Sequence, residues 1–242
     1  MARALWLLYG ALAVAELAAE ATGAAAPAFL LKLGLVPLLA TAWALSGGGD
    51  RRVLGFFVGS WVGDVTLSLA PLDPTDTQVL GLPKHDGWFL AGVLAFAAAH
   101  LSLIAALRDV DHPDRPGPWT SHRGWFAPLV TWAAVLGQLV LPPLAADPAR
   151  AAAVAPLALY AALLHVMVGF ALQRHGRVHH ASFVITLLGA CMFLVSDSLI
   201  GLTHLAHLLP QRAGAVAIMA TYLGAEALLA WGMLIGERRA AI

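Results

Sequence analysis

Apolar segments about twenty residues long recur along the whole of this 242-residue chain. A helix needs about 20 mostly apolar residues to cross the hydrocarbon core of a membrane. Eight segments approach or exceed that length, at residues 4–22, 28–46, 53–70, 88–108, 124–143, 151–173, 180–203 and 213–235. Backbone polar groups cannot stay unpaired in lipid, so segments of this length must be helices. The sequence therefore predicts an all-α, polytopic membrane protein, a bundle of eight transmembrane helices.

The polar remainder of the chain is small and scattered. Only 12% of the residues are charged, and no polar block is long enough to fold separately, so residues 1–242 are expected to form a single transmembrane domain. The breaks contain turn-forming residues: a polar loop is expected at 71–83, a proline-rich one at 109–123, and Pro142-Pro143 should end the fifth helix. The net charge is zero, which gives no electrostatic reason to expect a nucleic-acid partner.

Basic residues are unequally divided between the two ends of the predicted helices. With the N-terminus inside, ten fall on the cytoplasmic side: Arg3, Arg51, Arg52, Arg108, Arg115, Arg123, Arg174, Arg177, Arg238 and Arg239. Three fall on the other: Lys84, Arg150 and Arg212. Because Lys and Arg are retained on the cytoplasmic side, both termini are predicted to be cytoplasmic, and the expected location is a bacterial cell membrane. The first segment imitates a secretory signal, but Glu16 and Glu20 favour a retained helix.

Ionisable residues inside the predicted spans are the strongest indication of a functional site. They are Glu16, Glu20, Lys32, Asp64, His100, His165, Asp197 and Glu226. A charge at the centre of a membrane helix costs about 2.5–3.5 kcal/mol on insertion scales. We therefore expect these side chains to face the bundle interior, where they pair or lose their charge.

Helical spacing gathers several of these residues on defined faces. Ser60, Asp64 and Ser68 recur every four residues, and Tyr222 lies one turn before Glu226. Two further faces combine glycine with an aromatic ring and an ionisable group: Gly92, Phe96 and His100, and Gly189, Phe193, Asp197 and Gly201. These faces predict a buried polar site centred on Asp64 and Asp197. Lys32 and Glu226 have an alternative interpretation, as an interior pair that only holds helices together.

Four segments occur in an order that resembles a known family. They are Ser60 to Asp64, Gly92 through Phe96 to His100, Gly189 to Asp197, and Tyr222 to Glu226. Together they resemble the YhhN family of eight-helix membrane proteins, which includes the lysoplasmalogenases. The resemblance extends from about residue 28 to residue 235. The chain departs from the family pattern where Lys32 and Pro37 are separated and where Glu226 replaces a usual glutamine.

The resemblance implies hydrolysis of the vinyl ether bond of lysoplasmalogens, which releases a fatty aldehyde and a glycerophospho-ethanolamine or -choline. Such hydrolysis needs one protonated carboxyl as acid and one carboxylate to activate water, as in a glycosidase. Asp64 and Asp197 are the expected catalytic pair, with His100 orienting an acid or relaying a proton. The expected substrate-binding residues are Lys32, Ser60, Phe96, Ser196, Tyr222 and Glu226, with Lys32 meeting the phosphate.

Partners and alternatives follow from the same residues. A lysophospholipid substrate and membrane lipids are the expected partners, and no cofactor motif and no strong metal motif appear. Three other hypotheses remain open: a zinc hydrolase with His100, Asp64 and Asp197 as ligands, a proton-coupled transporter, and a lipid-binding protein without activity. Interior acids also mark ion paths, but no inverted repeat is evident.

Overall fold

The fold is that of a helical bundle, described here by a computed structural model that covers residues 1–69, 84–148 and 150–240. The predicted all-α class is confirmed, since the described residues contain helices and no strand. The long helices are α1 (Ala2–Thr22), α2 (Ala25–Leu45), α3 (Arg51–Leu69), α4 (Lys84–Leu107), α6 (Ala127–Ala146), α7 (Val154–Gln173), α8 (His180–Ile200) and α9 (Gln211–Ala240). Shorter elements are α5 (Pro118–Ser121), η1 (Arg123–Phe126), η2 (Ala151–Ala153) and η3 (Gly201–Leu205).

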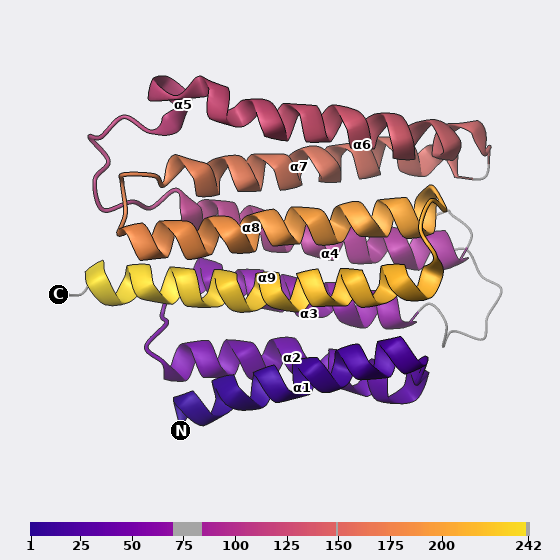
Figure 1. Ribbon diagram of the computed structural model, residues 1–242, viewed down its shortest axis with the longest axis horizontal. Coiled ribbons are helices and arrows are strands. Elements are labelled where there is room, and N and C mark those ends of the chain that lie inside the picture. Colours follow the sequence, from indigo (N-terminus) through magenta and orange to yellow (C-terminus); the bar gives the residue numbers. More distant parts are fainter. Residues whose placement is uncertain (70–83, 149, 241–242) are drawn as a thin grey trace.

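The long helices run side by side along one direction, with α1 and α2 at one edge of the bundle and α6 at the other (Figure 1). Helix α3 packs along α4, and α8 packs along α9. The start of α1 and the end of α9 lie at the same end of the bundle (Figure 1). This placement agrees with an even number of crossings, while the side of the membrane on which the termini lie stays a prediction.

Seven of the described helices are long and apolar enough to cross a membrane. Helix α3 is not among them, although it has 19 residues, because it carries Arg51, Arg52 and Asp64. The chain is therefore a polytopic membrane bundle by length and composition, and the eighth crossing rests on the placement of α3 among the other helices.

The predicted helix boundaries differ from the observed ones by a few residues, with one instructive error. Pro142-Pro143 does not end the fifth long helix, because α6 continues to Ala146. A proline lacks the backbone N–H but has a helical φ, so a helix can pass through it for one more turn. The polar loop predicted at 71–83 lies outside the described residues.

Pro37 leaves a backbone carbonyl of α2 without its helical partner, and a side chain of α3 satisfies it on the exposed side of the two helices. The missing N–H of Pro37 leaves the carbonyl of Leu33, four residues earlier, without its intrahelical donor. The indole N–H of Trp61 in α3 donates to that carbonyl oxygen at 2.9 Å. The proline thus links α2 to α3, one turn beyond Lys32.

Close helix packing depends on glycine at two contacts. A Cβ on Gly59 would lie 2.9 Å from the backbone nitrogen of Ala99, where α3 meets α4. A Cβ on Gly232 would lie 2.7 Å from the backbone nitrogen of Thr186, where α9 meets α8. Small residues let membrane helices approach closely, so these glycines set the spacing within both pairs.

Candidate functional site

A cavity of about 430 Å³ lies within the bundle, and residues of every long helix except α1 line it. Its wall is mostly apolar, and it carries a small set of polar side chains: Lys32, Asp64, Tyr160, His165, Ser196, Asp197, Ser198 and Tyr222. Apolar cavities with a few convergent polar groups are the usual form of small-molecule sites. The cavity is the candidate functional site because both predicted aspartates line it.

Asp64 of α3 is bound by a tyrosine of α9 and lies near a lysine of α2. Its side chain is 2% exposed, and the Tyr222 hydroxyl donates to its Oδ2 at 2.7 Å. Lys32 lies close enough to interact electrostatically with this carboxyl, without forming an ion pair within 4 Å. One carboxylate oxygen is thus fixed by a tyrosine, and the group has a nearby ammonium.

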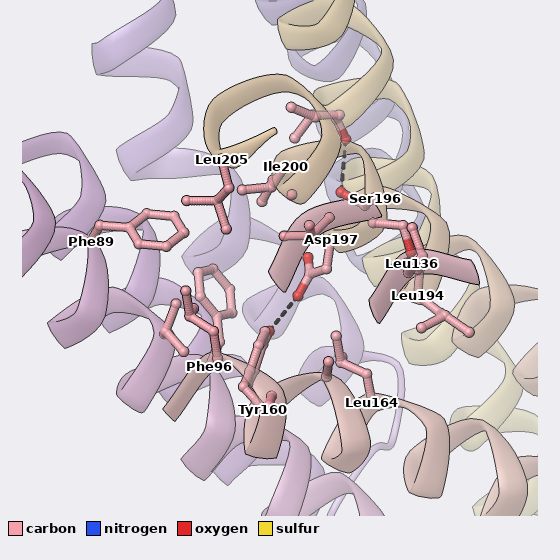
Figure 2. Close-up of a pocket in the computed structure, with 18 of the residues that line it drawn as sticks. Phe89, Phe96, Leu136, Tyr160, Leu164, Leu194, Ser196, Asp197, Ile200 and Leu205 are labelled. Atoms are coloured by element: carbon pink, nitrogen blue, oxygen red, sulfur yellow. Dashed lines mark hydrogen bonds between the residues drawn. The ribbon is translucent and has the colours of Figure 1, made fainter. Parts of the chain in front are cut away.

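Asp197 repeats this arrangement on the other side of the cavity with a tyrosine from a different helix. The Tyr160 hydroxyl of α7 donates a hydrogen bond to Oδ2 of Asp197. Figure 2 shows the two side chains pointing toward one another, with Phe96 beside them. Asp197 also interacts electrostatically with Asp64. The two carboxyls therefore belong to one site, and each accepts a hydrogen bond from its own tyrosine.

The cavity extends along the seam between α6 and α7. Ala133 and Gly137 of α6 and Ala158 and Ala161 of α7 line it, beside larger apolar residues of both helices. Leu144 is the one buried residue of α6, so this helix packs loosely on the bundle.

His100 does not line the cavity. It is fully buried, and its Nδ1 lies 2.7 Å from the carbonyl oxygen of Phe96, four residues earlier in α4. Its ring packs edge-on against Phe193 at 4.5 Å and Tyr160 at 5.9 Å. Within the described residues His100 bonds to neither aspartate, although the sequence predicts that it orients an acid or relays a proton. Tyr160 is the side chain that bonds to Asp197.

Ser60 and Glu226 lie behind Asp64 rather than on the cavity wall. Both are fully buried, and the carboxyl of Glu226 lies beside the hydroxyls of Ser60 and Tyr222. Glu226 lies near enough to interact electrostatically with Asp64 and with Tyr9. No ion pair joins Lys32 to Glu226 in the described part of the chain, so the predicted interior pair does not form here.

Phe96, Ser196 and Tyr222 do line the cavity, as expected of substrate-binding residues. The Ser196 hydroxyl is already engaged, since it donates to the carbonyl oxygen of Ile218 at 3.1 Å and joins α8 to α9 (Figure 2). The Ser196 hydroxyl therefore joins two helices and does not offer a free polar group to a ligand.

Tyr160 is the site residue that the sequence reading missed. It lies within the predicted span 151–173 and, unlike the aspartates, it carries no charge. A buried tyrosine hydroxyl usually finds a partner, and all three tyrosines of the chain donate to one: Tyr9 to the carbonyl of Leu223 at 2.8 Å, Tyr160 to Asp197 and Tyr222 to Asp64. The presence of a tyrosine hydroxyl within a predicted span could therefore have identified Tyr160 from the sequence.

A zinc site is not assembled by the described residues. No three histidine, cysteine or acidic side chains among them lie close enough together to hold a metal ion. His100, one of the three ligands that the zinc hypothesis requires, has its Nδ1 bonded to the helix backbone.

Comparisons with known proteins agree with the sequence motifs. No curated protein and no solved structure matches the chain. The model of the YhhN family matches residues 27–233, which include both Asp–Tyr pairs and all the residues that line the cavity. The chain therefore belongs to the YhhN family.

Proposed function

We propose that this protein is a lysoplasmalogenase-type hydrolase, which cleaves the vinyl ether bond of a lysoplasmalogen inside the membrane. The observation that carries the proposal is the pair of tyrosine-bound aspartates on the wall of one apolar cavity. Family membership supports it, since the YhhN family includes lysoplasmalogenases. A bacterial cell membrane is the proposed location.

The lining of the cavity suits a single-chain lipid. Phe89, Val93, Leu136 and Leu157 give it an apolar wall that matches an alkenyl chain. Lys32 is the one lysine or arginine on the described wall of this cavity, so it is the proposed contact for the lipid phosphate. The vinyl ether lies between the phosphate-bearing glycerol and the chain, and it would meet the aspartates between those two ends.

The chemistry requires a proton donor and a base. Transfer of a proton to the outer carbon of the vinyl ether gives an oxocarbenium ion, water adds to its cationic carbon as a base takes one proton, and the resulting hemiacetal collapses to the aldehyde and the glycerol hydroxyl. A positioned acid or base contributes about 10²–10⁴-fold to such steps.

We assign the two roles from the surroundings of each aspartate. The ammonium of Lys32 stabilises a negative charge on Asp64, so Asp64 is the proposed carboxylate that activates water and stabilises the cation. Asp197 has Tyr160 and the charge of Asp64 beside it, so Asp197 is the proposed acid. Tyr160 and Tyr222 hold the two carboxyls in position.

The test is aldehyde release from lysoplasmalogen by the purified protein in detergent. Asp64→Asn and Asp197→Asn should each lower kcat at least a hundredfold, because each removes the acid or the base. Asp111→Asn is the matched control, since Asp111 is exposed in the loop after α4 and lies outside the cavity. No aldehyde from the wild type, or full activity in both site variants, would show that the proposal is wrong.

A second candidate function is proton-coupled transport, which the two buried carboxyls outside the cavity favour. Glu16 and Glu226 are fully buried, and Glu16 has no hydrogen-bond partner in the described structure. Intramembrane acids of this kind occur in proton paths. Proton-dependent uptake of a lipid or solute into liposomes, without aldehyde release, would favour this alternative.

A further inference from the structure

A second cavity, of about 1060 Å³, lies between α6 and α7 at the end of the bundle that holds the start of α1. It is formed by the last residues of α4, the loop that follows, α5, η1 and the facing sides of α6 and α7. Val130 and Val166, on the two long helices, line it and are 67% and 48% exposed. The cavity therefore opens sideways, toward the hydrocarbon of the surrounding membrane.

One end of this cavity is basic. Arg108, Arg115 and Arg177 line it, with a single acid, Asp114. Arg115 donates to the carbonyl of Gly176 at 3.0 Å, and Arg177 donates to the carbonyl of Pro113 at 3.2 Å. A guanidinium has five N–H donors, so these bonds fix the two side chains and leave donors free. Arg108 is exposed and forms no ion pair among the described residues.

The remainder of the cavity is mostly apolar and aromatic. Trp119, Phe126, Leu129 and Phe170 line it, and Thr120, His165 and Gln173 are the polar residues among the rest. An amphiphile with an anionic head and a hydrocarbon chain matches both parts, and basic pockets between membrane helices bind anionic headgroups. From this geometry we propose that the second cavity is a binding site for an anionic membrane phospholipid, with the phosphate on the arginines and a chain between α6 and α7.

This site is separate from the candidate active site, and the proposal does not rest on the proposed reaction. Tyr160 at the first cavity and Gln173 at the second are 13 residues apart on α7, which corresponds to about 20 Å along the helix. A phosphate on the arginines would therefore hold its glycerol far from the aspartates. Ala133 and His165 line both cavities, so the chain of the bound lipid would end near the seam that leads to the first cavity.

Trp119 provides a direct readout, because a brominated lipid chain next to it quenches its fluorescence. The protein is placed in phosphatidylcholine nanodiscs that contain a small fraction of either phosphatidylglycerol or phosphatidylcholine with brominated chains. The signal of Trp119 is the difference between each protein and the same protein carrying Trp119→Phe. We expect brominated phosphatidylglycerol to quench Trp119 at much lower content than brominated phosphatidylcholine.

Variants then identify the residues responsible. A basic residue near an anionic surface contributes about fivefold to binding, so Arg108→Gln combined with Arg115→Gln should weaken phosphatidylglycerol binding about thirtyfold. Asp114→Asn should strengthen it, because it removes the one acid on the wall. Arg51→Gln is the matched control, since Arg51 is an exposed arginine at the same end of the bundle and lies outside the cavity.

Three outcomes would overturn the proposal. Equal quenching by the two lipids in the wild type would show no headgroup preference, and an equal loss in Arg51→Gln would show a general surface effect. Complete protection from quenching by millimolar glycerol phosphate would show that the arginines hold a free phosphate ester rather than a lipid. Thermal unfolding of each variant shows whether the bundle is intact, and aldehyde release is measured separately, so failure of one proposal leaves the other testable.

Discussion

At the scale of single residues, the feature that distinguishes this site is the pairing of each cavity aspartate with a tyrosine from another helix. Asp64 of α3 accepts from Tyr222 of α9, and Asp197 of α8 accepts from Tyr160 of α7. In a low-dielectric interior a carboxyl without a partner is costly. The tyrosines offset part of that cost and also fix the direction of each carboxyl, which leaves its second oxygen available to a ligand.

The tyrosine partner of Asp197 can be tested by removing one oxygen atom. Tyr160→Phe should lower kcat for aldehyde release about ten- to a hundredfold, because loss of one partner of a buried hydrogen bond costs about 1–3 kcal/mol and frees the carboxyl to rotate. The assay is steady-state kinetics with lysoplasmalogen in detergent.

Tyr9→Phe is the control for this experiment. It removes the same hydroxyl from a buried tyrosine that donates to the carbonyl of Leu223 and does not line the cavity. It should lower the unfolding temperature and leave kcat close to that of the wild type. An equal loss of kcat in the two variants would mean that Tyr160 acts only through stability.

At the scale of helices, the bundle combines two tight pairs with one loose helix. Glycines bring α3 against α4 and α8 against α9, and these pairs carry Asp64, Phe96 and Asp197. Helix α6 has one buried residue and borders both cavities. The tight pairs position the polar groups, and the loosely packed helix forms part of the wall of each cavity.

The tight α3–α4 contact predicts a large effect of one methyl group. Gly59→Ala should destabilise the protein by about 1–3 kcal/mol, because the new Cβ would lie 2.9 Å from the backbone of Ala99 and the helices would have to separate. Thermal unfolding in detergent measures the change.

Gly10→Ala is the matched control, because a Cβ on Gly10 meets nothing within 4 Å. That substitution should be neutral or slightly stabilising, since alanine favours the helix by about 0.5–1 kcal/mol over glycine. Equal unfolding temperatures for the two variants would contradict the packing account.

At the scale of the whole molecule, the membrane topology decides which leaflet the second cavity faces. The start of α1 and the end of α9 share one end of the bundle, and the second cavity lies at that end (Figure 1). Eight crossings would put both termini on one side of the membrane, and the bias of basic residues predicts that this side, with the arginine-lined cavity, is the cytoplasmic one. Anionic lipids give the cytoplasmic leaflet its negative surface potential, so the topology bears directly on the proposed lipid site.

Cysteine labelling tests that topology. In a Cys191→Ala background, Arg51→Cys and Ser121→Cys should both be protected from a membrane-impermeant maleimide in intact cells, and Gln211→Cys should react. All three side chains are exposed. If α3 does not cross while α4 does, Arg51→Cys and Ser121→Cys will label differently. Labelling after lysis shows that each cysteine is accessible in principle.

The sequence by itself determined the class of fold and the residues that lie inside it. Twenty-residue apolar segments can satisfy their backbone in lipid only as helices, so the helix order followed with boundary errors of a few residues. The one clear error, at Pro142-Pro143, arose because proline weakens a helix without forcing it to stop there. The cost of intramembrane charge selected Asp64 and Asp197, and both line the cavity.

Only the tertiary structure decided which of these residues share a wall. Helical periodicity assigns a side chain to a face, but not to a neighbour on another helix, so the sequence did not pair Asp197 with Tyr160 or separate His100 and Glu226 from the cavity. Those choices depend on how close the glycines let the helices come and on how each helix is rotated. The cost of placing each polar or charged group in lipid determined which side chains must lie inside the bundle. The packing between helices decided which of those side chains lie next to one another.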